Sequence, residues 1–315
     1  MTLTHHAKRV LTIAAGTPFL KTLAETLCDG TLTAGYQYDP ADPLSLAKVT
    51  IYVPTRRSAR VLRSEFVDLL GGRSAILPLI RPLGETDDDS GFFEIENPEI
   101  MDLAPPISGT GRLIELARLI LAWRNSLPDA IRAIHSDSPL VAPASPADAI
   151  WLARALGEVI DAMDTEEKDW EALAHLDTGD HAQWWQLTAD FLKIASVFWP
   201  ARLAELNRSS AGRHRNAILR AEADRLANLP DTGPIIVAGS TGSIPAAADL
   251  IAAVAALPQG TVVLPGLDLL MPEEQWQAIA EDPTDPSSRT HSQYGLYMLL
   301  QKLGIMRDDV VQIGA

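Results

Sequence analysis

A lysine and a threonine follow the first apolar segment at the spacing of a phosphate-binding loop. The segment Val10–Ala15 leads into Gly16 and Thr17, and the pair Lys21 and Thr22 follows. In such a loop, glycines let backbone N–H groups surround the phosphates, the lysine reaches the terminal phosphates and the hydroxyl binds Mg²⁺. These four polar or glycine positions are therefore the first candidates for contact with a nucleotide.

The same loop lacks part of what this chemistry needs. Ala15 stands six positions before the lysine, where the motif has a glycine, and Leu20 stands directly before it. Pro18 removes one of the N–H donors that a phosphate would need. We therefore expect no functional ATP site, although a working ATPase that uses Lys21 and Thr22 stays open as an alternative.

Hydrolysis of a nucleotide also needs a carboxylate at the tip of a nearby strand, to hold Mg²⁺ and to position water. The fourth apolar segment ends in Ala238–Thr241, which contains no acidic residue. Asp249 falls inside the following predicted helix, and Asp268 follows the fifth apolar segment. The sequence thus predicts no catalytic residue and neither ATP nor Mg²⁺ as a cofactor.

The second candidate site is a basic cluster that follows the second apolar segment. Its arginines are Arg56, Arg57, Arg60 and Arg63, and Thr55 and Ser58 add hydroxyl groups at the same predicted helix start. Guanidinium groups, hydroxyls and free helix N–H groups are donors suited to a phosphate backbone. The alternative is a solvated helix face partly neutralised by Glu65. A weaker basic stretch begins another predicted helix, at Arg208, Arg213, His214, Arg215 and Arg220.

Composition limits the function classes further. The chain has 315 residues and a net charge of -15, so binding of nucleic acid through bulk charge is excluded and any contact must come from local patches. Cys28 is the single cysteine, which excludes an internal disulfide and a four-thiolate metal site and favours a reducing, cytoplasmic compartment. No stretch reaches membrane-spanning length, and no zinc-protease or serine-hydrolase motif is present.

Short apolar segments rich in β-branched residues predict the elements that position these sites. They are Val10–Ala15, Val49–Val53, Ala75–Ile80, Pro234–Ala238 and Thr261–Leu264. Continuous apolar runs of this length are typical of parallel strands buried on both faces, and three of them lead into helical periodicity. The expected fold class is therefore α/β, with a parallel sheet of about five strands flanked by helices.

A long segment without strand signals interrupts this alternation. We expect residues 1–108 and 231–315 to form the α/β domain and residues 109–230 to form a helical insertion. Six of the seven tryptophans fall in the insertion, where helical spacing among Leu, Ile and Ala favours a role in its core over a base-stacking surface. Trp184 and Trp185 are the exception, because adjacent residues on a helix cannot both point into one core. An acidic loop is expected over residues 84–106.

The order of these motifs resembles the N-terminal part of a superfamily-one helicase. Thr55, Ser58, Ala59 and Leu62 resemble the start of a helicase motif whose final arginine falls on Glu65 here. Four longer strings look like the AddB family of bacterial AddAB helicase–nucleases: IRPLGETDD from Ile80, VAGSTGSIPAAADLI from Val237, VVLPGLD from Val262 and HSQYGLYMLLQKLG from His291.

This resemblance implies a RecA-like, P-loop-derived domain with a helical insertion, the 1A and 1B domains of such helicases. It implies a region that has lost motor function and that guides the 3′-terminated single strand during double-strand-break repair, scanning it for the regulatory sequence Chi. The AddA motor subunit and single-stranded DNA are the implied partners. Thr55, Arg56 and Ser58 match the family's DNA-contacting positions, and Arg81 is a further candidate. The nuclease domain and iron–sulfur cluster of the family fall outside this chain, which we expect to correspond to an N-terminal fragment. A scaffold that docks AddA without touching DNA is the remaining alternative.

Overall fold

The computed structural model describes residues 8–83, 103–127, 143, 145–171, 182–229, 233–280 and 286–314. The chain forms two compact units, which we name the α/β unit (Met1–Met101 with Ala217–Ala315) and the helical unit (Asp102–Asn216). The second boundary falls inside helix α11 (Ala211–Ala227), which contributes residues to both units. The sequence had placed it at residue 230, because the pattern of a continuous helix carries no sign of where its packing partners change.

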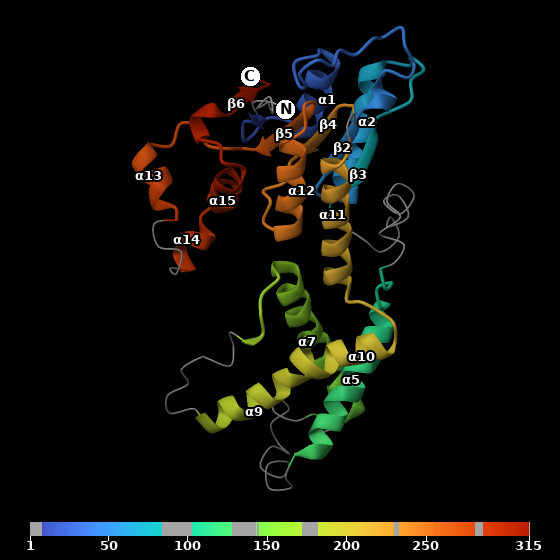
Figure 1. Cartoon of the computed structure of the whole chain (residues 1–315), viewed down its shortest axis with the longest axis vertical. Helices are drawn as coiled ribbons and strands as arrows, with labels where there is room; N and C mark the ends of the chain where they lie inside the picture. The colour runs from blue at the N-terminus through green and yellow to red at the C-terminus, as the bar shows by residue number, and fades with distance from the viewer. Residues whose placement is uncertain are drawn as a thin grey trace. The chain divides into compact units, whose positions relative to one another are not determined.

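The α/β unit contains a six-stranded, fully parallel sheet with the strand order β3-β2-β4-β5-β1-β6. The strands are β1 (Arg9–Ile13), β2 (Thr50–Val53), β3 (Leu79–Pro82), β4 (Ile235–Ala238), β5 (Gly260–Pro265) and β6 (Val311–Ile313). The predicted α/β class with a parallel sheet is confirmed, and the arrangement is compatible with a RecA-like fold (Figure 1).

Two strands differ from the prediction. The third strand starts at Leu79, because Ala75–Pro78 is an irregular segment in which Ile76 N–H donates to the Pro43 carbonyl at 2.8 Å. The sheet also has a sixth strand, β6, which the sequence did not predict. Only three residues long and largely exposed at the sheet edge, β6 lacks the apolar run that marks a buried strand.

Helices α1 (Phe19–Cys28) and α2 (Arg56–Leu70) cover one face of the sheet. The predicted apolar stripe of α2 is confirmed, since Ala59, Leu62, Phe66 and Leu70 are all buried. They pack with the alternate strand residues Ile51, Ile236 and Val263, as expected when successive side chains point to opposite faces.

The opposite face carries helices α12 (Pro245–Ala255) and α15 (Tyr294–Leu303), which pack on each other. Tyr52 and Arg81 point to this face, where the C-terminal half of α11 contacts them through Glu222. The short helices α13 (Glu273–Ala278) and α14 (Pro286–Thr290) precede α15. Single 3₁₀ turns span Leu46–Lys48 and Arg307–Asp309.

The helical unit has its own hydrophobic core. The elements of this unit are α5 (Gly109–Ser126), α7 (Pro146–Glu166), α9 (Ala182–Lys193), a π-helical turn (Ile194–Phe198), α10 (Trp199–Glu205) and the start of α11. Trp199 is buried and Trp123 packs on the same cluster, as predicted, but the prediction is wrong for Trp151, which is 62% exposed. The side chains of Trp184 and Trp185 lie outside the described residues. In the described part of the chain, no helix has the length and apolarity to cross a membrane.

Candidate nucleic-acid interface

The candidate residues gather where the parallel strands end. Gly239 directly follows β4 and has a φ of +81°. A Cβ atom at Gly239 would lie 3.2 Å from Phe19 Cε1 and 3.6 Å from Pro54 Cδ. The loops after β1, β2 and β4 therefore meet at the carboxyl edge of the sheet, and the starts of α1 and α2 lie on either side of β4.

Thr55 is the N-cap of α2. Its Oγ1 accepts a hydrogen bond from Ser58 N–H at 3.0 Å, and the two hydroxyl oxygens are also 3.0 Å apart. Such a cap satisfies one of the free donors at a helix start. The first role of this Thr–Ser pair is thus to fix where α2 begins, and so to hold the following arginines at the carboxyl edge.

The start of α2 concentrates positive charge. Arg57 and Arg60 are exposed, Arg56 is half-buried, and the first turn contains no acidic residue. The N-terminal end of a helix already carries partial positive charge, and each unfavourable charge there costs about 0.3–1 kcal/mol. Among the described carboxylates, none forms an ion pair with Arg57 or Arg60. An anion bound at this helix start would relieve the repulsion.

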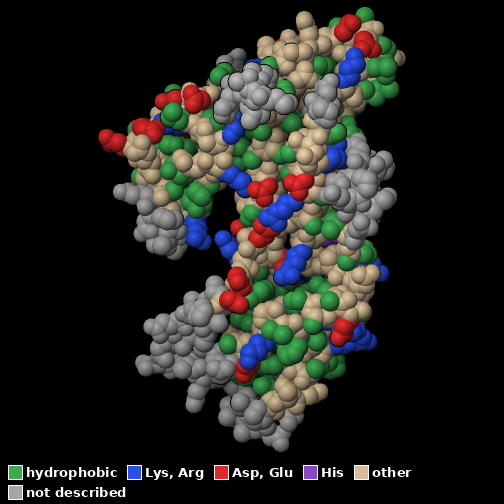
Figure 2. Space-filling view, in the orientation of Figure 1, with side chains coloured by type: hydrophobic (Ala, Val, Ile, Leu, Met, Phe, Trp, Pro, Cys, Tyr) green, Lys and Arg blue, Asp and Glu red, His purple; other side chains and the backbone are tan. Residues whose placement is uncertain are grey.

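Among the described residues on the face drawn in Figure 2, no comparable concentration of positive charge is visible. Figure 2 shows acidic and basic side chains interspersed over the face it presents, without a continuous basic area. This mixture agrees with the net charge of -15. In a chain with this net charge, attraction of a phosphate backbone must come from a local site, and the α2 start is one such site.

Arg81 does not belong to this surface. The sequence placed Arg81 after the third strand, but it lies within β3 and is 3% exposed. Ile80 points toward α1 and α2, so Arg81 points to the opposite face, where its Nη1 donates to Glu222 Oε1 at 3.1 Å. We therefore remove Arg81 from the candidate DNA-contacting residues.

Glu222 is the centre of a buried network that sequence reasoning missed. Its fully buried carboxylate accepts hydrogen bonds from Tyr52 Oη, from Arg81 and from Arg225, the last at 2.7 and 2.8 Å. Burial, followed by the nearby Glu222 charge, raises the pKa of Tyr52 far above its usual value. One signal was available, because an arginine in a buried strand requires a carboxylate partner.

The loop after β1 is a tight turn in which one backbone donor is already engaged. Thr17 N–H donates to the Ala14 carbonyl at 3.2 Å, and Gly16 has a φ of +87°. Lys21 lies on the exposed side of α1, with its Nζ 3.9 Å from Glu25. The residues of the predicted loop are thus adjacent, but the Thr17 donor is already engaged within the turn.

Thr22 is covered by the segment that follows β6. Its side chain is 7% exposed, and a Cβ atom built at Gly314 would overlap Thr22 Cγ2. Gly314 has a φ of +73°, so both its backbone conformation and its space favour glycine. The residue whose hydroxyl would bind Mg²⁺ in a phosphate-binding loop is therefore buried here.

The carboxylates considered for Mg²⁺ have structural partners instead. Asp249 pairs with Lys302 at 2.5 Å and with Arg220 at 3.4 Å. Asp268 Oδ1 accepts from the N–H groups of Leu270 and Met271, both at 2.9 Å. Within the described residues, no three His, Cys, Asp or Glu side chains are grouped so that they could hold a metal ion.

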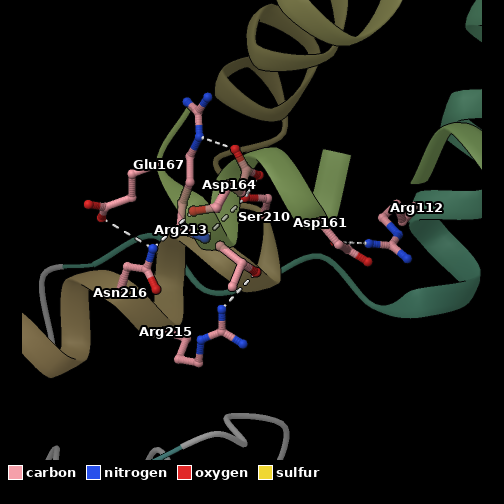
Figure 3. Close-up of polar contacts among 9 residues, drawn as sticks. Arg112, Asp161, Asp164, Glu167, Ser210, Arg213, Arg215 and Asn216 are labelled. Atoms are coloured by element: carbon pink, nitrogen blue, oxygen red, sulfur yellow. Dashed lines mark hydrogen bonds and ion pairs between the residues drawn. The ribbon is translucent and has the colours of Figure 1, made fainter. Parts of the chain in front are cut away.

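Two arginines of the second basic stretch, Arg213 and Arg215, form contacts between α7 and α11 (Figure 3). Asp164 accepts from Ser210 Oγ at 2.6 Å and from Arg213 Nε at 2.8 Å. Arg215 Nη2 donates to Thr165 Oγ1 at 2.8 Å, and Asn216 Nδ2 donates to the Asp164 carbonyl at 2.9 Å. These contacts fix one helix against another, and they leave the α2 start as the better candidate site.

Comparison with known proteins gives no identification: the sequence matches no protein-family model and no curated protein.

Proposed function

We propose that this chain is a non-catalytic, helicase-like module of the AddB type, which binds single-stranded DNA at the start of α2. The observation that carries the proposal is the pair of exposed arginines, Arg57 and Arg60, at the carboxyl edge of a parallel sheet. In open α/β sheets, ligands bind outside the carboxyl ends of the strands. A cationic helix start at that edge, in an otherwise acidic chain, fits a phosphate backbone.

The proposed ligand is a single strand because the site is small and local. Two or three guanidinium groups and a helix start can contact a few consecutive phosphates, while acidic side chains elsewhere oppose a longer duplex footprint. Thr55 and Ser58 orient the helix, and Arg56, Arg57 and Arg60 supply the donors. In this proposal the superfamily-one 1A domain corresponds to the α/β unit and the 1B insertion to the helical unit.

The loop geometry favours a binding role over catalysis. Thr17 N–H is bonded within its turn, Thr22 is covered near Gly314, and β4 ends without a carboxylate. Nucleotide hydrolysis needs free backbone donors in this loop, an accessible hydroxyl at its end and a carboxylate at the tip of a nearby strand. We therefore propose that translocation depends on a separate motor subunit of the AddA type and that this module guides and scans the 3′-terminated strand during double-strand-break repair.

The first experiment is titration of the full chain with fluorescently labelled oligo(dT) over a salt series. The variant Arg57→Ala/Arg60→Ala is compared with Arg118→Ala/Lys193→Ala, which removes the same charge from exposed positions of the helical unit. We expect binding that weakens with salt. For single strands the log–log salt slope changes by about 0.7 per phosphate contact, so loss of two contacts should reduce it by roughly 1.4. The control should leave it unchanged. An equal reduction of the salt slope in both variants would contradict the proposal, and so would the absence of DNA binding by the wild type at low salt.

A second titration, with a labelled ATP analogue and Mg²⁺, separates this module from an ATPase. We expect no binding. Tight Mg²⁺-dependent binding that disappears in Lys21→Ala would instead support the ATPase alternative. If the Arg57→Ala/Arg60→Ala variant leaves DNA binding by an assembled motor complex unchanged, the scaffold alternative is favoured.

A further inference from the structure

A pocket of about 230 Å³ lies in the α/β unit between α13, the C-terminal end of α15 and the turn Arg307–Asp309. This turn directly precedes β6, so the pocket is near the amino end of that strand. The arginines of the α2 start follow the carboxyl end of β2 in the same parallel sheet. The pocket is thus separate from the proposed DNA site, and its function is independent of the proposal made above.

One wall of the pocket is rigid. The Arg307 guanidinium lies 5.1 Å from the centroid of the Trp276 ring. Arg307 Nη1 donates to the Met271 carbonyl at 2.7 Å, and Nη2 donates to Glu273 Oε2 at 2.9 Å. Tyr297 contacts Trp276 with a centroid distance of 5.3 Å. These contacts fix Trp276 and Arg307, both of which are buried, so the wall exists before any ligand binds.

The size of the pocket indicates what it can hold. Pockets for drug-sized ligands and cofactors begin at about 300 Å³, and a water molecule takes about 30 Å³ of liquid volume. The space of about 230 Å³ therefore fits one large side chain better than a cofactor. Leu300 and Ile305 add apolar lining, and Met306, which is 75% exposed, supplies an adaptable apolar group.

The pocket lining is also acidic on its solvent side. Glu273, with a side chain 57% exposed, and Asp308 line the pocket, and Glu274 and Asp309 are exposed beside them. Arg307 is buried and already paired with Glu273. The exposed charge around the pocket is therefore negative, which disfavours a phosphate group and favours a cation next to the inserted apolar group.

We propose that this pocket binds a peptide segment of a partner protein that carries an aromatic or large aliphatic side chain beside a lysine or arginine. The apolar side chain enters between Leu300, Ile305 and the Trp276–Arg307 wall. The basic side chain lies at Asp308, next to the Glu273–Arg307 pair. A buried anchor flanked by complementary charge is the usual composition of a peptide-binding hot spot.

The test is selection of a random 12-residue phage-displayed peptide library on the immobilised full chain. We expect enrichment of peptides with an aromatic, Leu, Ile or Met residue within two positions of Lys or Arg. Affinities of labelled synthetic copies are then measured by fluorescence anisotropy. Met306→Lys should weaken binding at least tenfold, and Asp308→Lys should weaken it severalfold, with the loss smaller at high salt. Both substitutions are at exposed positions.

Matched controls separate the pocket from general attraction of basic peptides to an acidic protein. Val67→Lys and Asp68→Lys make the same changes at exposed positions of α2 and should leave the affinity within twofold of the wild type. The proposal is wrong if no such motif is enriched, or if the Met306→Lys and Asp308→Lys variants bind as well as their controls. Displacement of the selected peptide by adenosine or thymidine would contradict the proposal and would indicate instead that the pocket binds a nucleobase.

Discussion

The guanidinium of Arg81 donates to the carboxylate of Glu222 at 3.1 Å, although the two residues are 141 positions apart in the sequence. Both side chains are buried, with 3% and 0% exposure. Arg81 belongs to the strand before the helical unit, and Glu222 belongs to the part of α11 that follows the helical unit. This contact therefore joins the two separate sequence segments of the α/β unit, together with Tyr52 and Arg225.

Substitution of Glu222 tests the importance of this contact. Glu222→Gln keeps the shape of the side chain and removes the carboxylate charge with which Arg81 and Arg225 are paired. Breaking one side of a buried pair costs about 3–5 kcal/mol. Urea unfolding followed by circular dichroism should show a loss of this size, and amide hydrogen exchange should accelerate first in β2 and β3. The exposed Asp249, substituted as Asp249→Asn, is the control and should cost at most about 1 kcal/mol. Equal losses for the two variants would show that the buried network is not a major source of stability.

Substitutions of Thr55 separate its capping role from DNA contact. Thr55→Ala removes the bond to Ser58 N–H and should lower stability by about 1 kcal/mol. Thr55→Asp keeps a capping oxygen but adds negative charge beside the arginines. We expect Thr55→Asp to retain the stability of the wild type and to bind oligo(dT) more weakly than Thr55→Ala does. The reverse order of DNA affinities would contradict an anion-binding role for the α2 start.

Gly314 and Thr22 provide a test of how tightly the segment after β6 is packed. Gly314→Ala places a methyl group into Thr22, and such overpacking costs about 1–3 kcal/mol beyond the backbone penalty of a left-handed alanine. Gly71→Ala is the matched control, because Gly71 has a φ of +58° and open space around its Cβ position. Hydrogen exchange should show loss of protection in β6 for Gly314→Ala alone. Unchanged β6 protection in that variant would mean that Thr22 is more accessible than the packing indicates.

The thiol of Cys28 should react slowly. Burial raises the pKa of Cys28 from 9.0 to about 11, while the charge of Arg73 opposes this shift only partly. Because the thiolate is the nucleophile, a rise of two pKa units lowers the reactive fraction at pH 8 about 100-fold. The rate of alkylation by iodoacetamide should therefore increase about tenfold per pH unit up to about pH 11. The urea-unfolded chain, in which the burial is lost, should react about 100-fold faster at pH 8. Equal rates for the folded and unfolded chain would contradict this account.

The sequence predicted the central elements of the fold and failed at its edge. Buried strands such as β4 have continuous apolar residues, and the stripe of Leu62 and Phe66 on α2 repeats at helical spacing, so both were predicted. β6 is short and exposed, and its pairing with β1 depends on a distant partner, which no local pattern reveals.

The sequence also predicted one part of the candidate site, the start of α2, and misplaced another, Arg81. Thr55 and Ser58 follow the spacing of an N-cap, and exposed Arg57 and Arg60 lie outside the apolar stripe, so their placement follows from local rules. Arg81 was misplaced because the third strand was expected to end at Ile80, two residues before its observed end at Pro82. Its side chain direction, and the approach of Glu222 from a distant helix, are properties of the assembled sheet.

The position of β1 has a consequence for synthesis of the chain. β1 is synthesised before the strands that it pairs with, β5 and β6, and Thr12 contacts Leu264 across 252 residues. At a translation rate of about 5–20 residues per second, the 252 residues between Thr12 and Leu264 take roughly 13–50 s, and β6 follows later still. During that time an apolar strand is without its two partners, whereas the helical unit can already complete its own core. A newly made chain should therefore depend on chaperones to protect β1, until β5 and β6 pair with it.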